Sequence, residues 1–77
     1  MATAQLHLTF PGGLDRERTM AMLRTSFPLH LNIRRANVED QAAWFIVDLT
    51  GEDEEIERAA AWLLEREVTV DRIPIEG

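Results

Sequence analysis

Strict alternation of apolar and polar side chains is the feature that most limits the folds open to this chain. In the segment from Leu29 to Arg34, three apolar residues take one side of an extended strand and three polar residues take the other. The same alternation runs through 6–10, and in 44–49 Phe45, Val47 and Leu49 take one side while the other side is partly apolar as well. A last strand is predicted to begin with Val68 and Val70 and to continue through Ile73, where Pro74 limits further pairing. The pattern predicts four strands, most of them buried on one face.

The segment between the first and second strands has apolar residues at helical spacing. Asp15 is suited to cap a helix whose apolar residues Met20, Leu23 and Phe27 recur at intervals of three and four, and Pro28 ends it. We therefore expect a helix that packs on the sheet through one side.

A second helix is predicted after the third strand. We expect Thr50 to cap it, because an acid follows three residues later, and the acidic run 52–55 suits the positive end of the helix dipole. We also expect Glu54 and Arg58 to form an exposed pair at a spacing of four. The predicted buried stripe consists of Ile56, Ala59, Ala60 and Leu63.

The resulting order βαββαβ predicts an α+β, ferredoxin-like sandwich over residues 1–77 as a single domain. Right-handed crossovers around a central hairpin give a four-stranded antiparallel sheet in the order 4-1-3-2, with both helices on one face. The second strand is expected to contain a bulge or a change of twist at 34–36.

The opposite face of the sheet is predicted to carry Trp44 and Ile46, next to the strand that contains Asn32 and Arg34. One interpretation is an isolated exposed tryptophan covered by Arg34 through a cation–π contact. The other is a dimer interface or a small-ligand site, with Trp44 as the anchor and Asn32 orienting polar groups. The residues alone leave both open.

Several functional classes are disfavoured. A net charge of -6 argues against nucleic acid as a partner. The absence of cysteine removes thiolate nucleophiles, iron–sulfur ligation and cysteine-based zinc sites, and the acidic run 52–55 lacks the spacing of a calcium loop. His7 and His30 have no evident catalytic partners, so we expect no enzyme, no metal and no cofactor. No apolar run approaches the ~20 residues of a membrane span, and we expect a cytoplasmic protein without membrane insertion.

Short motifs in a fixed order make the chain resemble the NIL domain. They are Leu6-His7-Leu8-Thr9-Phe10-Pro11-Gly12, Phe27, Asn32-Ile33-Arg34, Asp48-Leu49-Thr50-Gly51, Ala61-Trp62-Leu63 and Val68-Thr69-Val70-Asp71. The family is known for the regulatory C-terminal domains of methionine ABC-importer ATPases, which have an ACT-like fold, pair with each other and bind methionine. The resemblance implies a sensor or interaction domain.

Carried over to this chain, the family motif implies ligand-binding residues at Asn32, Ile33 and Arg34, with Asn32 as the orienting amide. Arg34 replaces an aliphatic residue, and the arginine either pairs with a ligand carboxylate or marks a loss of methionine binding. Glu67 stands where glycine often ends the second helix, which predicts a positive φ angle there.

The expected function is a non-enzymatic regulatory domain that forms a homodimer and binds an amino acid, with methionine as the first candidate, at or near the interface containing Trp44 and Ile46. The alternative is a ligand-free interaction module in sulfur or amino-acid metabolism. Its partner would be a protein such as a transporter or a metabolic enzyme.

Overall fold

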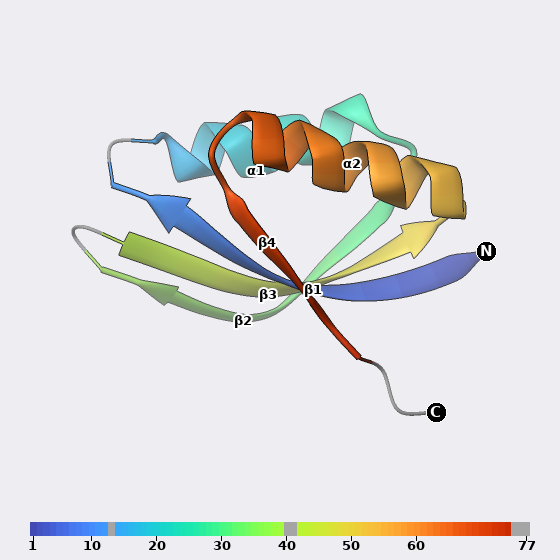
Figure 1. Ribbon diagram of the computed structural model, residues 1–77, viewed down its shortest axis with the longest axis horizontal. Coiled ribbons are helices and arrows are strands. Elements are labelled where there is room, and N and C mark those ends of the chain that lie inside the picture. Colours follow the sequence, from blue (N-terminus) through green and yellow to red (C-terminus); the bar gives the residue numbers. More distant parts are fainter. Residues whose placement is uncertain (13, 40–41, 75–77) are drawn as a thin grey trace.

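Four strands and two helices follow one another in the predicted order βαββαβ (Figure 1). The computed structural model describes residues 1–12, 14–39 and 42–74. The elements are β1 (Ala2–Pro11), α1 (Arg16–Ser26), β2 (His30–Val38), β3 (Ala42–Gly51), α2 (Asp53–Glu65) and β4 (Thr69–Ile73).

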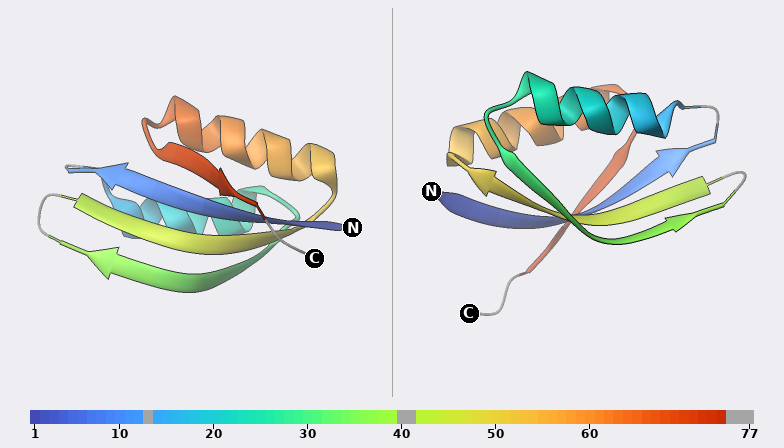
Figure 2. Two further views of the ribbon diagram at one scale, coloured as in Figure 1. Left: turned by 60° about the horizontal axis from the view of Figure 1, so that its bottom comes forward. Right: turned by 180° about the vertical axis from the view of Figure 1, so that it is seen from behind.

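All strand pairs are antiparallel, and the sheet has the order β2-β3-β1-β4, which is the predicted order read from the other edge. Both helices lie on the same face of the sheet, and Figure 2 shows this from two further directions. The ferredoxin-like α+β fold is therefore confirmed.

Alternation along the strands supplies the floor of the core. Leu6, Leu8 and Val47 have no exposed surface, and Phe10 meets Phe45 edge to face with their ring centroids 5.3 Å apart. The helices cover this layer with residues that are likewise buried: Met20, Leu23, Ile56, Ala59 and Leu63. Ala60, expected in the same stripe, is only partly buried.

The two helices begin differently. The Asp15 carboxylate accepts a hydrogen bond from the backbone N–H of Arg18 at 3.0 Å, as predicted for the cap of α1. The prediction that Thr50 caps α2 is wrong, because β3 continues through Gly51 and the Thr50 hydroxyl lies 3.0 Å from that of Thr3. Glu52 precedes α2 instead, without a side-chain capping bond.

Two further local predictions had different outcomes. Arg58 pairs with Glu55 at 2.8 Å rather than with Glu54, so the spacing is three residues instead of four. Glu67 has a φ of 68° after the last turn of α2, as predicted for a position that favours glycine.

A register shift confirms the irregularity expected in β2. Ile33 pairs with Val47, whereas Arg35 pairs with Ile46, so Arg34 is the additional residue of a bulge. After the bulge, Val38 pairs with the buried Ala43 and therefore faces the helix side. Inward-facing residues of β2 have odd numbers before Arg34 and even numbers after it.

Candidate functional site

A polar row crosses three strands on the open face, the side of the sheet away from the helices. Gln5 and Asn32 both pair with Asp48, from β1 and β2 respectively. The Gln5 amide donates to Asp48 Oδ1 at 3.1 Å, and Arg34 Nη1 lies 3.3 Å from Asp48 Oδ2. Asp48 therefore already neutralises Arg34, although 56% of the arginine side chain remains exposed.

Trp44 belongs to a second cluster on the same face. Its ring stacks on His7, with the centroids 5.2 Å apart and an interplanar angle of 23°. Ile46 pairs with His7 in the register, and both Trp44 and Ile46 are partly buried. The interpretation that Arg34 covers Trp44 is therefore wrong, because Arg34 is bound to Asp48 and His7 covers the indole.

The two open-face clusters are separate. Trp44 pairs with Asn37, whereas Asn32 pairs with Asp48, four residues further along β3. At about 3.3 Å per strand residue this separation is about 13 Å. A single small molecule held by Asn32 would not also be anchored by Trp44.

Ile33 lies on the other face. Its partner Val47 is completely buried, so the side chain of Ile33 is directed toward the helix layer, yet it is 41% exposed. The three residues taken from the family motif thus divide between the two faces of an edge strand, with Asn32 and Arg34 on the open face.

A cavity of about 310 Å³ lies beside Ile33, between the start of α1 and β2. We call it the helix-side pocket; it is lined by Arg16, Glu17, Met20, Ile33, Val38 and Phe45. Sequence reasoning missed this pocket. The signal was Val38, an apolar residue at the end of a polar strand, whose orientation depends on the bulge.

A second cavity, of about 280 Å³, lies where β4 ends, and it is lined by Thr3, Ala4, Gln5, Arg72, Ile73 and Pro74. Arg72, its main charged group, is already bound to Glu57. Among its described lining residues, this cavity therefore presents no cationic side chain without a partner.

Among the described residues, the contacts of His7 do not include a carboxylate partner. His7 pairs with Asp71 in the register, but its Nδ1 contacts the Thr9 hydroxyl at 3.4 Å, and no ion pair of the described residues includes it. Within 1–12, 14–39 and 42–74, no three His, Asp or Glu side chains are grouped to hold a metal ion. Neither described helix is long and apolar enough to cross a membrane.

Comparison with known proteins gives two matches. The family model of the NIL domain matches residues 4–72. Among solved structures, the chain is similar to the C-terminal domain of an ABC transporter ATP-binding protein from Enterococcus faecalis, with a TM-score of 0.74 and 19% sequence identity. The match covers 95% of this chain and 86% of the other, and at this identity it supports the fold. No curated protein matches significantly.

Proposed function

This chain belongs to the NIL domain family, and from that premise we propose that it is a non-enzymatic regulatory domain that binds an amino acid at or near the interface of a homodimer. Methionine is the first candidate, because the family resemblance implies it. The observation that carries the proposal is the position of Asn32, the family's motif amide, in the polar row of the open face.

The chemistry of this row suits a zwitterion. Arg34 offers a cation for a carboxylate, Asp48 offers an anion for an ammonium group, and the amides of Gln5 and Asn32 can donate and accept. Ligand binding at this row would exchange the existing contact between Arg34 and Asp48 for contacts to the ligand. Ile33, on the other face, would support the strand from the helix side.

For the dimer we propose the cluster of Trp44 and Ile46 as the contact surface. Aromatic residues are enriched among the residues that dominate binding at protein interfaces. Two partly exposed apolar side chains next to a stacked imidazole form an apolar area within an otherwise polar face. A ligand in the neighbouring polar row would then lie near the interface.

Calorimetry with L-methionine tests the proposal. We expect a saturable heat for the wild-type chain and an affinity about tenfold lower for Asn32→Ala, because a hydrogen bond to a charged group of the ligand contributes about 1.5–3 kcal/mol and about 1.4 kcal/mol corresponds to tenfold. Asn37→Ala is the matched control: it removes the other exposed amide of β2, which lies opposite Trp44, and should leave the affinity unchanged. Absence of both heat and a thermal shift at millimolar methionine would contradict ligand binding.

The ion pair between Arg34 and Asp48 favours a second candidate, a ligand-free interaction module, because the arginine already has a carboxylate partner. The partner would be a protein of sulfur or amino-acid metabolism or a transporter ATPase, the class named for the similar Enterococcus faecalis domain. Such partners suggest a cytoplasmic location. Partner binding that is unaffected by methionine would favour this candidate over the first.

A further inference from the structure

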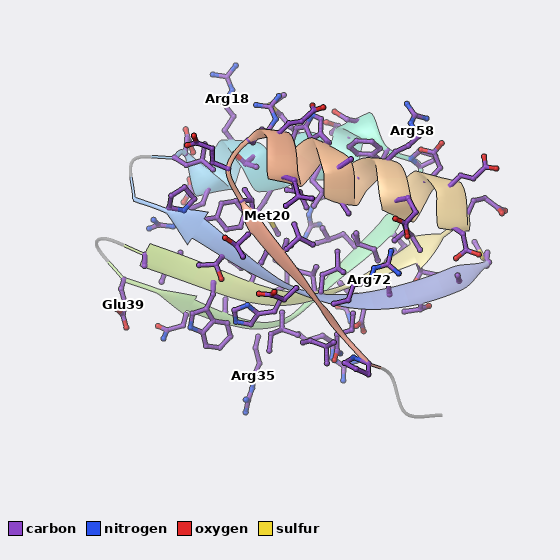
Figure 3. The ribbon with its side chains drawn as sticks, in the orientation of Figure 1. Arg18, Met20, Arg35, Glu39, Arg58 and Arg72 are labelled. Atoms are coloured by element: carbon purple, nitrogen blue, oxygen red, sulfur yellow. The ribbon has the colours of Figure 1, made fainter. Side chains whose placement is uncertain are left out.

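The edge strand β2 presents different chemistry on its two sides. On the helix side, Ile33 and Val38 are 41% and 51% exposed. On the open side, Arg35 pairs with Ile46 and points away from the helices (Figure 3). An outer strand added to this edge would therefore meet apolar groups on one face and a basic group on the other.

β2 has room for such a strand. It is the last strand on its side of the sheet, and every residue from Asn32 to Val38 is exposed. The backbone groups on its outer side have no partner strand among the described residues. An exposed edge of this kind is a template for pairing with another extended segment.

The helix-side pocket lies along the same edge. The nearly buried Met20 and Phe45 form its floor, and the exposed Ile33 and Val38 form its rim. Its volume of about 310 Å³ is at the lower end of the range of about 300–1,000 Å³ for ligand pockets, which suits a single apolar group. An edge strand next to a pocket for alternate side chains is the arrangement used in β-strand addition.

The charge of β2 indicates which side chains an added strand would carry on its open-face side. The chain as a whole has a net charge of -6, yet Arg34 and Arg35 adjoin each other in the middle of β2. Arg34 is bound to Asp48, whereas Arg35 takes part in no ion pair of the described residues. An acidic side chain on the open-face side of an added strand would be complementary to Arg35.

We propose that β2 and the helix-side pocket bind an extended segment of a partner protein, with apolar side chains on one face and acidic side chains on the other. This inference rests on the proposed role of the domain in regulating a protein partner, and it identifies the docking surface and the chemistry of the bound segment. One apolar side chain enters the helix-side pocket, and an acidic neighbour pairs with Arg35.

A second copy of the chain is the less suitable occupant. Antiparallel self-pairing centred on β2 would bring Arg34 opposite its own copy, and like charges directly opposite each other destabilise a strand pair. The bulge at Arg34 further restricts regular pairing to the residues on either side of it. An acidic partner strand avoids the charge conflict.

The test is an NMR titration of the ¹⁵N-labelled chain with a capped peptide, Thr-Leu-Glu-Leu-Glu-Thr. We expect saturable amide shifts at Ile33, at Val38 and in the first turns of α1. Val38→Asp should weaken binding at least about tenfold, because it places a charge where Ile33 and Val38 form an apolar part of the pocket wall. Leu64→Asp is the matched control: it makes the same change at a residue of α2 that is 58% exposed, and it should leave binding unchanged.

A second pair of variants tests the charge. Arg35→Gln should lower the affinity for the same peptide several-fold. Arg18 lies on the outer surface of α1 (Figure 3), so Arg18→Gln should leave the affinity unchanged. A peptide with lysine in place of glutamate should bind more weakly to the wild-type chain. Circular dichroism establishes that each variant has the wild-type fold.

Three results would overturn the inference. The first is the absence of amide shifts at Val38 with millimolar peptide, and the second is an equal loss of peptide affinity for Val38→Asp and Leu64→Asp. The third is a lower sedimentation mass of the free protein on Val38→Asp, which would identify a second copy of the chain as the occupant. Methionine binding is measured separately by calorimetry. If the chain binds the peptide but not methionine, the proposed ligand has failed; if it binds methionine but not the peptide, the proposed docking surface has failed.

Discussion

Glu67 holds a backbone conformation that L-residues rarely adopt, with φ at 68° where α2 passes into β4. Glycine adopts this conformation without the steric cost of a Cβ atom. We expect Glu67→Gly to raise the free energy of unfolding by up to about 1 kcal/mol, since the relief of strain exceeds the added entropy of the unfolded chain. Urea unfolding measures the change.

Ala61→Gly provides the comparison, because Ala61 is exposed within α2 and has helical geometry. The same glycine should cost about 1 kcal/mol there. If both variants lose stability to a similar extent, the positive φ at Glu67 carries no strain.

At the scale of single residues, the sequence predicted which face the side chains of regular strand segments take, but not the faces after the bulge in β2 or the neighbours across the sheet. Alternation placed Asn32 on the open face and Ile33 on the helix side, as the register does. It did not predict that Trp44 lies opposite Asn37, because the partner across two strands depends on register. The bulge shifts that register by one residue, and the local pattern does not specify the size of the shift.

At the scale of elements, the two helix starts differ in one hydrogen bond. The Asp15 carboxylate accepts from the Arg18 N–H at 3.0 Å, whereas Glu52 makes no side-chain capping bond. We expect Asp15→Ala to lower the free energy of unfolding by about 1 kcal/mol and Glu52→Ala to have little effect. Thermal and urea unfolding of both variants check this, and equal losses would show that the capping bond of Asp15 adds no stability.

The start of α2 also shows a limit of reasoning from local motifs. Thr50 has the spacing of a capping residue, but it lies opposite Thr3 in a strand pair that extends to Gly51. The strand partner that prevents Thr50 from capping the helix is 47 residues away in the chain. Local propensity identified the helix, and a long-range pairing determined where it begins.

At the scale of the whole molecule, the proposed dimer depends on Trp44 and Ile46. We expect Trp44→Ser to shift the protein from dimer to monomer in sedimentation while the fold is retained, because Trp44 lies on the open face and outside the buried core. Leu64→Ser, which removes another exposed apolar side chain, should leave the dimer intact. An unchanged mass for Trp44→Ser would contradict this interface.

The order of elements was enough to predict the complete topology, because right-handed crossovers leave few arrangements for βαββαβ. The helix-side pocket could not be predicted in the same way. Its walls come from α1, β2 and β3, and its opening depends on how far α1 covers the edge of the sheet. The position of α1 over the sheet depends on packing between elements, which the apolar pattern of one segment does not predict.

The bulge at Arg34 has a consequence for how the length of this chain can vary. Elsewhere in β2, removing one residue would turn every following side chain to the opposite face. Removing Arg34 would instead join Ile33 to Arg35, whose partners Val47 and Ile46 are already consecutive in β3. Arg34 is therefore the position in β2 at which a relative could lose a residue while each remaining side chain stays on its own side of the sheet.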